Sequence, residues 1–95
     1  MINTNRLLAL FEKLVSIDNP SYGEREIGDS VISILRSIGI EANEDNSAEI
    51  TGGNCGNLYA YIDGDIDLPP ILFSAHLDAV EPASDKKMKI DEIYK

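Results

Sequence analysis

The single histidine of the chain and an aspartate two positions later, His76 and Asp78, are the side chains whose spacing best suits chemistry. Residues i and i+2 of an extended chain point to the same side, so these two side chains share one face. A neutral imidazole nitrogen binds zinc, and a carboxylate on the other ring nitrogen fixes the tautomer and orientation of the ring. The pair therefore suits a metal ligand with its orienting carboxylate, although a loop histidine beside an unrelated aspartate shows the same pattern.

The segment before this pair is a nearly continuous apolar run of strand length, residues 71–75. Such a run is typical of a strand that is covered on both faces. Active sites of open α/β sheets lie at the carboxyl ends of strands, which is where His76 and Asp78 fall. Only two helices are predicted in this chain (below), which are few to cover both faces of a sheet. We therefore expect the chain to be part of a larger domain.

Two amphipathic helices are predicted in the first half of the chain. Apolar residues recur with helical spacing between residues 7 and 15 and again between residues 27 and 38. Thr4 or Asn5 is expected to cap the first helix, and Asn19-Pro20 prevents its continuation beyond about residue 18.

Both ends of the second helix carry recognisable signals. Ser21 and Glu24 have the spacing of a capping box, in which each side chain bonds to the backbone of the other residue. Gly39 is expected at the first position after the helix, followed by Ile40, which can close a Schellman contact.

The second half of the chain changes to strand patterns. Residues 40–44 predict a short edge strand, residues 46–56 a polar loop and residues 58–62 a further strand with aromatic content. Helices followed by strands predict an α/β fold in which helices pack on a sheet. The charged tail, residues 83–95, has weak periodicity and is compatible with either a strand or a loose segment.

Composition narrows the class of protein. The 95 residues fit one domain, and the hydrophobic fraction of 43% with a charged fraction of 26% predicts a folded chain. The net charge of −9 repels phosphates, which argues against partners such as nucleic acid or an anionic membrane surface. One cysteine, Cys55, excludes an internal disulfide. No secretory signal or spanning segment is recognised, so we expect a cytoplasmic protein.

Three segments in the same order resemble one family. Residues 73–82 resemble the first metal-binding signature of the di-zinc exopeptidases related to peptidase T, aminoacylase and carboxypeptidase G. Residues 15–21, followed by Glu24, resemble the exit of that family's first helix, and residues 56–60 resemble its Gly-Asn-Leu-x-Ala strand start.

The end of the metal-binding signature is most similar to the peptidase T-like, or tripeptidase-like, branch because Glu81 and Pro82 close it. Two positions depart from the pattern: Ala79 stands where threonine is usual, and Ala83 where glycine is common in that branch.

The resemblance implies a role for each residue of the pair and a fold for the whole. His76 would bind one of two zinc ions, and Asp78 would orient it as an active-site residue. The fold would be an α/β/α sandwich, with residues 1–95 as the N-terminal portion of the catalytic domain. The remaining ligands, the general base and a lid or dimerisation domain would lie beyond this chain, which we therefore expect to be inactive alone and to bind zinc weakly.

The function implied is that of a zinc-dependent aminopeptidase or tripeptidase-like enzyme that hydrolyses short peptides. Two alternatives stay open: an N-acyl amino acid amidohydrolase of the same family, and a non-catalytic acidic interaction module in which His76 is incidental. In each case the bare apolar run at residues 71–75 predicts that the chain associates with itself.

Overall fold

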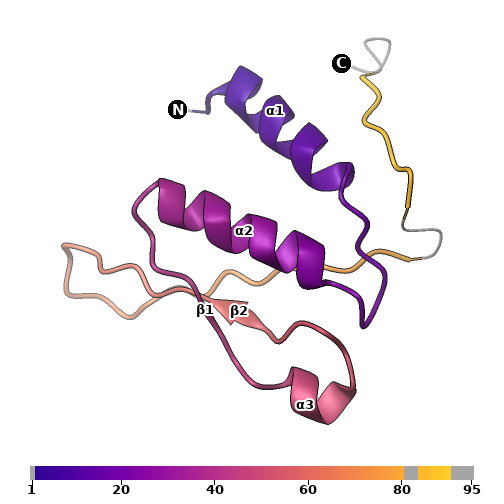
Figure 1. Ribbon diagram of the computed structural model, residues 1–95. Coiled ribbons are helices and arrows are strands. Elements are labelled where there is room, and N and C mark those ends of the chain that lie inside the picture. The colour runs from indigo at the N-terminus through magenta and orange to yellow at the C-terminus, as the bar shows by residue number, and fades with distance from the viewer. Residues whose placement is uncertain (1, 81–83, 91–95) are drawn as a thin grey trace.

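The computed structural model describes residues 2–80 and 84–90 and contains helices and a small sheet (Figure 1). Helices α1 and α2 lie beside each other, and the strand pair lies close to α2. None of the helices in the described ranges has the length and apolar character needed to cross a membrane. The elements are α1 (Thr4–Val15), α2 (Arg25–Ser37), β1 (Asn43–Glu44), α3 (Ala48–Thr51) and β2 (Leu58–Tyr59).

The N-cap of helix α1 lies one residue before the first of the two positions that the sequence suggested. The N-cap is Asn3, whose side-chain oxygen accepts a 3.0 Å hydrogen bond from the backbone N–H of Arg6. The prediction of Thr4 or Asn5 as the cap was wrong. Thr4 and Asn5 lie inside the helix, and Asn3 accepts from an N–H group of the first turn in their place.

Helix α1 ends at Val15, within the limit at about residue 18 that the sequence set. The backbone beyond the helix is used for distant contacts: the carbonyl of Ile17 accepts from Lys86 Nζ at 3.0 Å, and that of Asn19 accepts from the Ala79 N–H at 2.9 Å. Residues 17–19 therefore leave the helical path to reach the segment that carries the candidate site.

The capping box predicted for α2 is not formed. The N-cap is Glu24, which makes no capping bond, and its carboxylate accepts from the Tyr22 N–H at 3.0 Å. Ser21 directs its hydroxyl to Asp78 instead. The N–H of Arg25 is satisfied from outside the helix, by the side-chain oxygen of Asn54 at 2.9 Å.

The predicted Schellman end of α2 is confirmed. Gly39 has a φ of 85°, a left-handed conformation that glycine adopts without steric cost. Its N–H donates to the Arg36 carbonyl at 3.1 Å, and the N–H of Ile40 donates to the Leu35 carbonyl at 2.9 Å.

The strands predicted at residues 40–44 and 58–62 are present but shorter, as β1 and β2. β1 pairs antiparallel with β2, with Asn43 opposite Tyr59 and Glu44 opposite Leu58. The predicted polar loop between them contains the one-turn helix α3, which the sequence analysis did not anticipate. The α/β class agrees with these helices and this two-stranded sheet.

The expectation that residues 71–75 form a strand covered on both faces was wrong for this chain. Ile71 is 81% exposed, and Leu72 and Phe73 are each 90% exposed. Within the described ranges, no backbone hydrogen bond joins residues 71–76 to a neighbour. A strand exists only as part of a ladder, and none of the described elements pairs with this segment.

The buried part of the molecule is small and lies around the start of α2. The buried hydrophobic residues in the described ranges are Ile27, Ala42 and Cys55, and no large side chain there is fully buried. The chain exposes 8175 Å² of surface, roughly half as much again as the 5,400 Å² or so of a compact monomer of this mass. Its radius of gyration, 15.5 Å, likewise exceeds the roughly 12 Å of a compact chain of this length.

Candidate functional site

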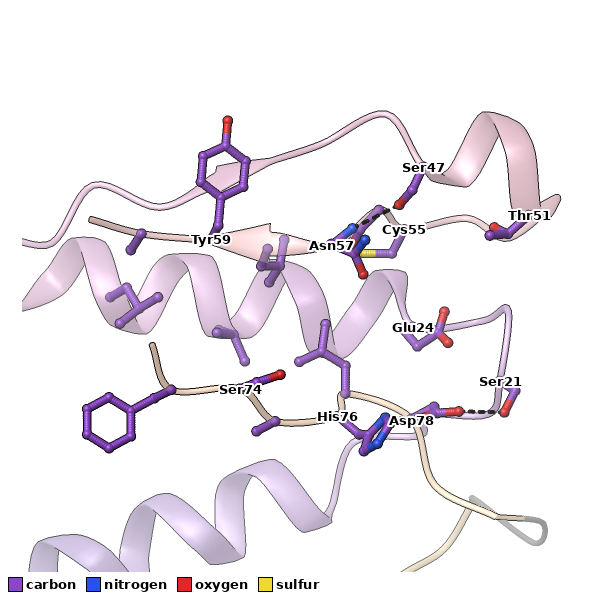
Figure 2. A pocket seen from close by; sticks show the side chains of 18 of the residues that line it. Ser21, Glu24, Ser47, Thr51, Cys55, Asn57, Tyr59, Ser74, His76 and Asp78 are labelled. Atoms are coloured by element: carbon purple, nitrogen blue, oxygen red, sulfur yellow. Dashed lines mark hydrogen bonds and ion pairs between the residues drawn. The ribbon is translucent and has the colours of Figure 1, made fainter. Parts of the chain in front are cut away.

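A pocket of about 940 Å³ lies between α2, β2 and the segment that ends in the predicted pair (Figure 2). Val31 and Leu35 contribute the α2 side of its lining, and Tyr59 contributes part of the β2 side. His76 and Asp78 lie together at one end, next to the turn that precedes α2 (Figure 2). The pocket thus combines an apolar wall with an imidazole and a carboxylate.

The structure brings the two predicted site residues together. His76 Nδ1 lies 3.7 Å from Asp78 Oδ1, a contact that is longer than a direct hydrogen bond. The imidazole is 93% exposed and the carboxylate 36% exposed. Since Nδ1 faces Asp78, the other ring nitrogen, Nε2, is the one left for an incoming ligand.

The second carboxylate oxygen of Asp78 is held by a residue far away in sequence. The hydroxyl of Ser21 donates to Asp78 Oδ2 at 2.7 Å, the bond drawn in Figure 2. Ionised acceptors make the stronger hydrogen bonds, and this one leaves Oδ1 toward His76. The three side chains therefore form one ordered row from Ser21 through Asp78 to His76.

The backbone on both sides of Asp78 is held by Asn19, which is 8% exposed. Its side-chain NH₂ donates to the Leu77 carbonyl at 2.6 Å, and its carbonyl accepts from the Ala79 N–H at 2.9 Å. Its side-chain oxygen accepts from Lys86 Nζ at 2.7 Å. A buried amide with both ends satisfied is a rigid anchor, because breaking either bond would leave a buried polar group unpaired.

A second polar cluster fixes the strand pair to α2. Arg25 contacts Glu44 through two nitrogens, at 2.6 and 2.9 Å, and Asp29 through a 2.7 Å ion pair. The Gly56 N–H donates to the same Glu44 carboxylate at 2.9 Å. The hydrogen bond with Glu44 is the main reason that the pKa of Arg25 lies above its ordinary value, and the same bond lowers the pKa of Glu44.

The loop around α3 is ordered by one partly buried carboxylate, that of Asp45. Asp45 accepts from the hydroxyl and N–H of Ser47 at 2.6 and 3.0 Å, and from the N–H and side chain of Asn57 at 2.8 and 3.0 Å. These bonds, led by that from the Ser47 hydroxyl, lower the pKa of Asp45 to about 2.

The single thiol is not suited to act as a nucleophile. Cys55 is buried, and loss of solvent raises the pKa of its thiol. A reactive cysteine needs a stabilised thiolate, so this side chain fills space beside Gly28 and does not carry chemistry.

The fit of the site to a metal ion is partial. His76 and Asp78 have the contact expected of a ligand and its orienting carboxylate. Across residues 2–80 and 84–90, no group of three or more histidine, cysteine, aspartate or glutamate side chains could hold a metal ion. The described residues therefore supply one ligand position and do not complete a coordination shell.

The chain is similar in fold and in sequence to part of an aminopeptidase. Its fold matches part of a solved aminopeptidase structure. That protein is aminopeptidase PepT from Bacillus cereus ATCC 10987, with a TM-score of 0.89 and 32% sequence identity over 96% of this chain and 25% of that one.

A curated relative matches this chain over a similar share of its length. The uncharacterized protein YqjE of Bacillus subtilis (strain 168) is 33% identical over 94 residues, which are 99% of this chain and 25% of that protein. No family model matches the chain. The chain spans about a quarter of the length of each of these two proteins.

Sequence reasoning found His76 and Asp78 but not the residues that hold them. Asn19 and Ser21 were interpreted only as a helix stop and a helix cap. A signal was present, because residues 15–21 formed one of the three segments of the family resemblance. Their partners lie 57 and 58 positions away, so local patterns could not show the contacts.

Proposed function

We propose that this chain supplies a zinc ligand and its orienting carboxylate to an aminopeptidase or tripeptidase-like enzyme that hydrolyses short peptides. The observation that carries the proposal is the contact between His76 and Asp78 in a chain whose fold matches aminopeptidase PepT at a TM-score of 0.89. The negative net charge of −9 suits an amine-bearing substrate better than a phosphate-bearing one. The proposed location is the cytoplasm.

Each residue of the pair has a distinct task in this proposal. Asp78, whose Oδ1 lies 3.7 Å from His76 Nδ1, favours the neutral tautomer that carries its proton on Nδ1, which leaves Nε2 free to bind. Zinc, when bound, polarises a peptide carbonyl and makes a bound water a nucleophile at neutral pH. The open position of His76 permits such binding without rearrangement of the fold, since its side chain is 93% exposed.

The proposal also predicts what the 95 residues do alone. Catalytic zinc sites hold the ion by three protein ligands and keep one position for water. Because the described residues supply one imidazole, we expect weak zinc binding and no turnover of a tripeptide panel. Titration calorimetry checks the first point: a tight stoichiometric site that His76→Ala abolishes would show that the chain builds its own complete site.

A chimera tests the activity directly. The quarter of Bacillus cereus PepT that matches this chain is replaced by the chain, and tripeptides and N-acyl amino acids are offered as substrates. We expect peptide hydrolysis that falls by at least about 100-fold in His76→Ala and about 10–100-fold in Asp78→Asn. Asp65→Asn is the matched control, because Asp65 is exposed and lies outside the pocket.

The outcomes separate the alternatives. A chimera that folds and hydrolyses peptides equally well with His76→Ala contradicts the proposal and favours an incidental histidine. Hydrolysis of N-acyl amino acids in place of peptides would favour the amidohydrolase alternative.

A further inference from the structure

We infer that Asn19 and Ser21 are positioning residues that hold Asp78 in the orientation from which it faces His76. This inference rests on the proposed function, in which Asp78 orients the imidazole. The segment that carries both residues, residues 19–21, is called the clamp below. It lies between α1 and α2 in the chain. It contacts residues 76–79, called the site loop, and Ser21 approaches Asp78 from the opposite side to His76 (Figure 2).

The clamp fixes the backbone of the site loop at the positions on either side of Asp78. Asn19 bonds to the Leu77 carbonyl through its side chain and to the Ala79 N–H through its own carbonyl, at 2.6 and 2.9 Å. Pro20 and Ala79 form a parallel bridge. The backbone of Asp78 is therefore held from both neighbours, which leaves its side chain as the main freedom.

The clamp then restricts that side chain. Ser21 donates to Asp78 Oδ2 at 2.7 Å, while the other oxygen, Oδ1, lies 3.7 Å from His76 Nδ1. Without the hydroxyl, the carboxylate of an aspartate that is 36% exposed would rotate among solvent-facing positions. The Ser21 bond thus selects the rotation in which one oxygen is directed to the imidazole.

Termination of α1 does not require these contacts. Pro20 by itself disfavours helical backbone at Asn19, whatever the side chain there. A side chain that only ended a helix could face solvent, whereas Asn19 is 8% exposed and its amide is bonded at both ends, to Leu77 and to Lys86. The burial and the pairing are explained by a role in holding the loop.

The test uses the tautomer of His76, because the chain contains one histidine and its ring nitrogens give unambiguous nitrogen-15 NMR signals. The whole 95-residue chain is measured without metal at about pH 9, well above the ordinary imidazole range near 6.5. We expect the ratio of the Nδ1–H to the Nε2–H form to be highest in the unaltered chain. Asp78→Ala sets the value without any orienting carboxylate.

Ser21→Ala should lower this ratio about threefold, toward the Asp78→Ala value, because a single net hydrogen bond is lost. Ser21→Thr keeps a hydroxyl at the same position and should restore the ratio. Ser74→Ala is the matched control, since Ser74 lines the same pocket and is not part of the clamp. Backbone chemical shifts of α1 and α2 verify that each variant keeps its fold.

Asn19→Asp provides a second, independent arm. The substitution preserves size but places an acceptor against the Leu77 carbonyl, so we expect the Ala79 amide to exchange about fivefold faster and the tautomer ratio to fall. Asn5→Asp, an exposed position on α1, is the control and should change neither quantity.

The possible failures are distinguishable. If Asp78→Ala lowers the tautomer ratio but Ser21→Ala and Asn19→Asp do not, the clamp has no positioning role and the inference is overturned, while the proposed function is untouched. If Asp78→Ala has no effect either, the inference is overturned at its first step. The proposed function is decided separately, by the His76→Ala chimera, which contains no clamp substitution.

Discussion

Two neighbouring regions of the chain are organised in opposite ways. In residues 25–57, several turns are fixed by a side chain that bonds to backbone, as Asp45 does for the loop around α3 and Glu44 does for Gly56. In residues 60–76, large apolar side chains face solvent. Those that are 70% exposed or more are Tyr61, Ile62, Ile66, Leu68, Ile71, Leu72 and Phe73.

The difference shows that local polar bonds, together with a few buried side chains such as Ile27, Ala42 and Cys55, can define a segment, whereas an apolar segment depends on cover from elsewhere. Each hydrogen bond is satisfied within a few ångströms and needs no large buried volume. Hydrophobic stabilisation is proportional to the area removed from water, and residues 71–73 remove almost none in this chain. The predictions below test this contrast, from the largest expected effect to the smallest.

The largest effect should be on association. We propose that the exposed run at residues 71–73 pairs with a second copy of the chain, because burial of one large aliphatic side chain contributes about 1.5–3 kcal/mol. The charge of −9 opposes this, but salt screens it beyond about 8 Å at physiological ionic strength. Light scattering over a concentration series should show a dimer or larger species.

The double variant Leu72→Asp with Phe73→Lys should shift that species to monomer. Ile50→Lys is the control, since Ile50 is 88% exposed but lies alone on α3. A monodisperse monomer of the unaltered chain at all concentrations would contradict self-association.

Next in size is the substitution Gly56→Ala. A Cβ at this position would collide with the backbone carbonyl oxygen of Asp45 and lie 2.8 Å from its Oδ1. Overpacking against backbone costs about 1–3 kcal/mol, which we expect as a loss in the free energy of unfolding measured with denaturant. Gly64→Ala is a matched control because nothing lies within 4 Å of its Cβ. Equal stabilities of the two variants would show that the close approach at Gly56 is unimportant.

A smaller loss is expected from Arg25→Ala, which removes the link between α2 and β1. The pair with Glu44 is bidentate, but the two side chains are 37% and 26% exposed, so solvent screening limits the loss to about 1 kcal/mol. Arg36→Ala, whose contact with Glu41 is 3.9 Å long and well exposed, should change the unfolding midpoint little. Similar losses in both variants would argue against a special role for Arg25.

The smallest effect is a pH dependence in the loop around α3. The pKa of Asp45 is lowered from 3.8 to about 2, so its contribution to stability is complete above pH 4 or so and is lost as the pH falls through 2. The amide signals of Ser47 and Asn57 should shift with a midpoint near pH 2. Asp45→Asn should abolish that transition, and Asp63→Asn should not. A midpoint near 3.8 would show that the four bonds are absent in solution.

Local signals predicted the helices well and the site only in part. The Schellman end at Gly39 depends on a short local stretch, residues 35–40, and was found from sequence, as was the sharing of one face by His76 and Asp78. The capping box failed because the hydroxyl of Ser21 has an acidic partner 57 positions away that competes with the helix backbone. No short window of sequence contains both members of that pair.

The apolar run at residues 71–75 failed for a different reason. Its residue types do favour a buried strand, but burial is a property of what surrounds a segment and not of the segment alone. Within the described ranges nothing covers Leu72 or Phe73. The residue types therefore call for covering elements that residues 2–80 and 84–90 do not provide.

The contact between Asn19 and Leu77 spans 58 residues and sets an order of events in folding. Helices of this length form within about a microsecond, whereas contacts across long stretches of chain must first overcome the entropy of loop closure. At synthesis rates of about 5–20 residues per second, residues 19–21 wait roughly 3–12 s for their partners to be made. During synthesis the side chains of Asn19 and Ser21 are therefore without these partners for seconds, and the loop that carries His76 cannot take its final shape until it contacts residues 19–21.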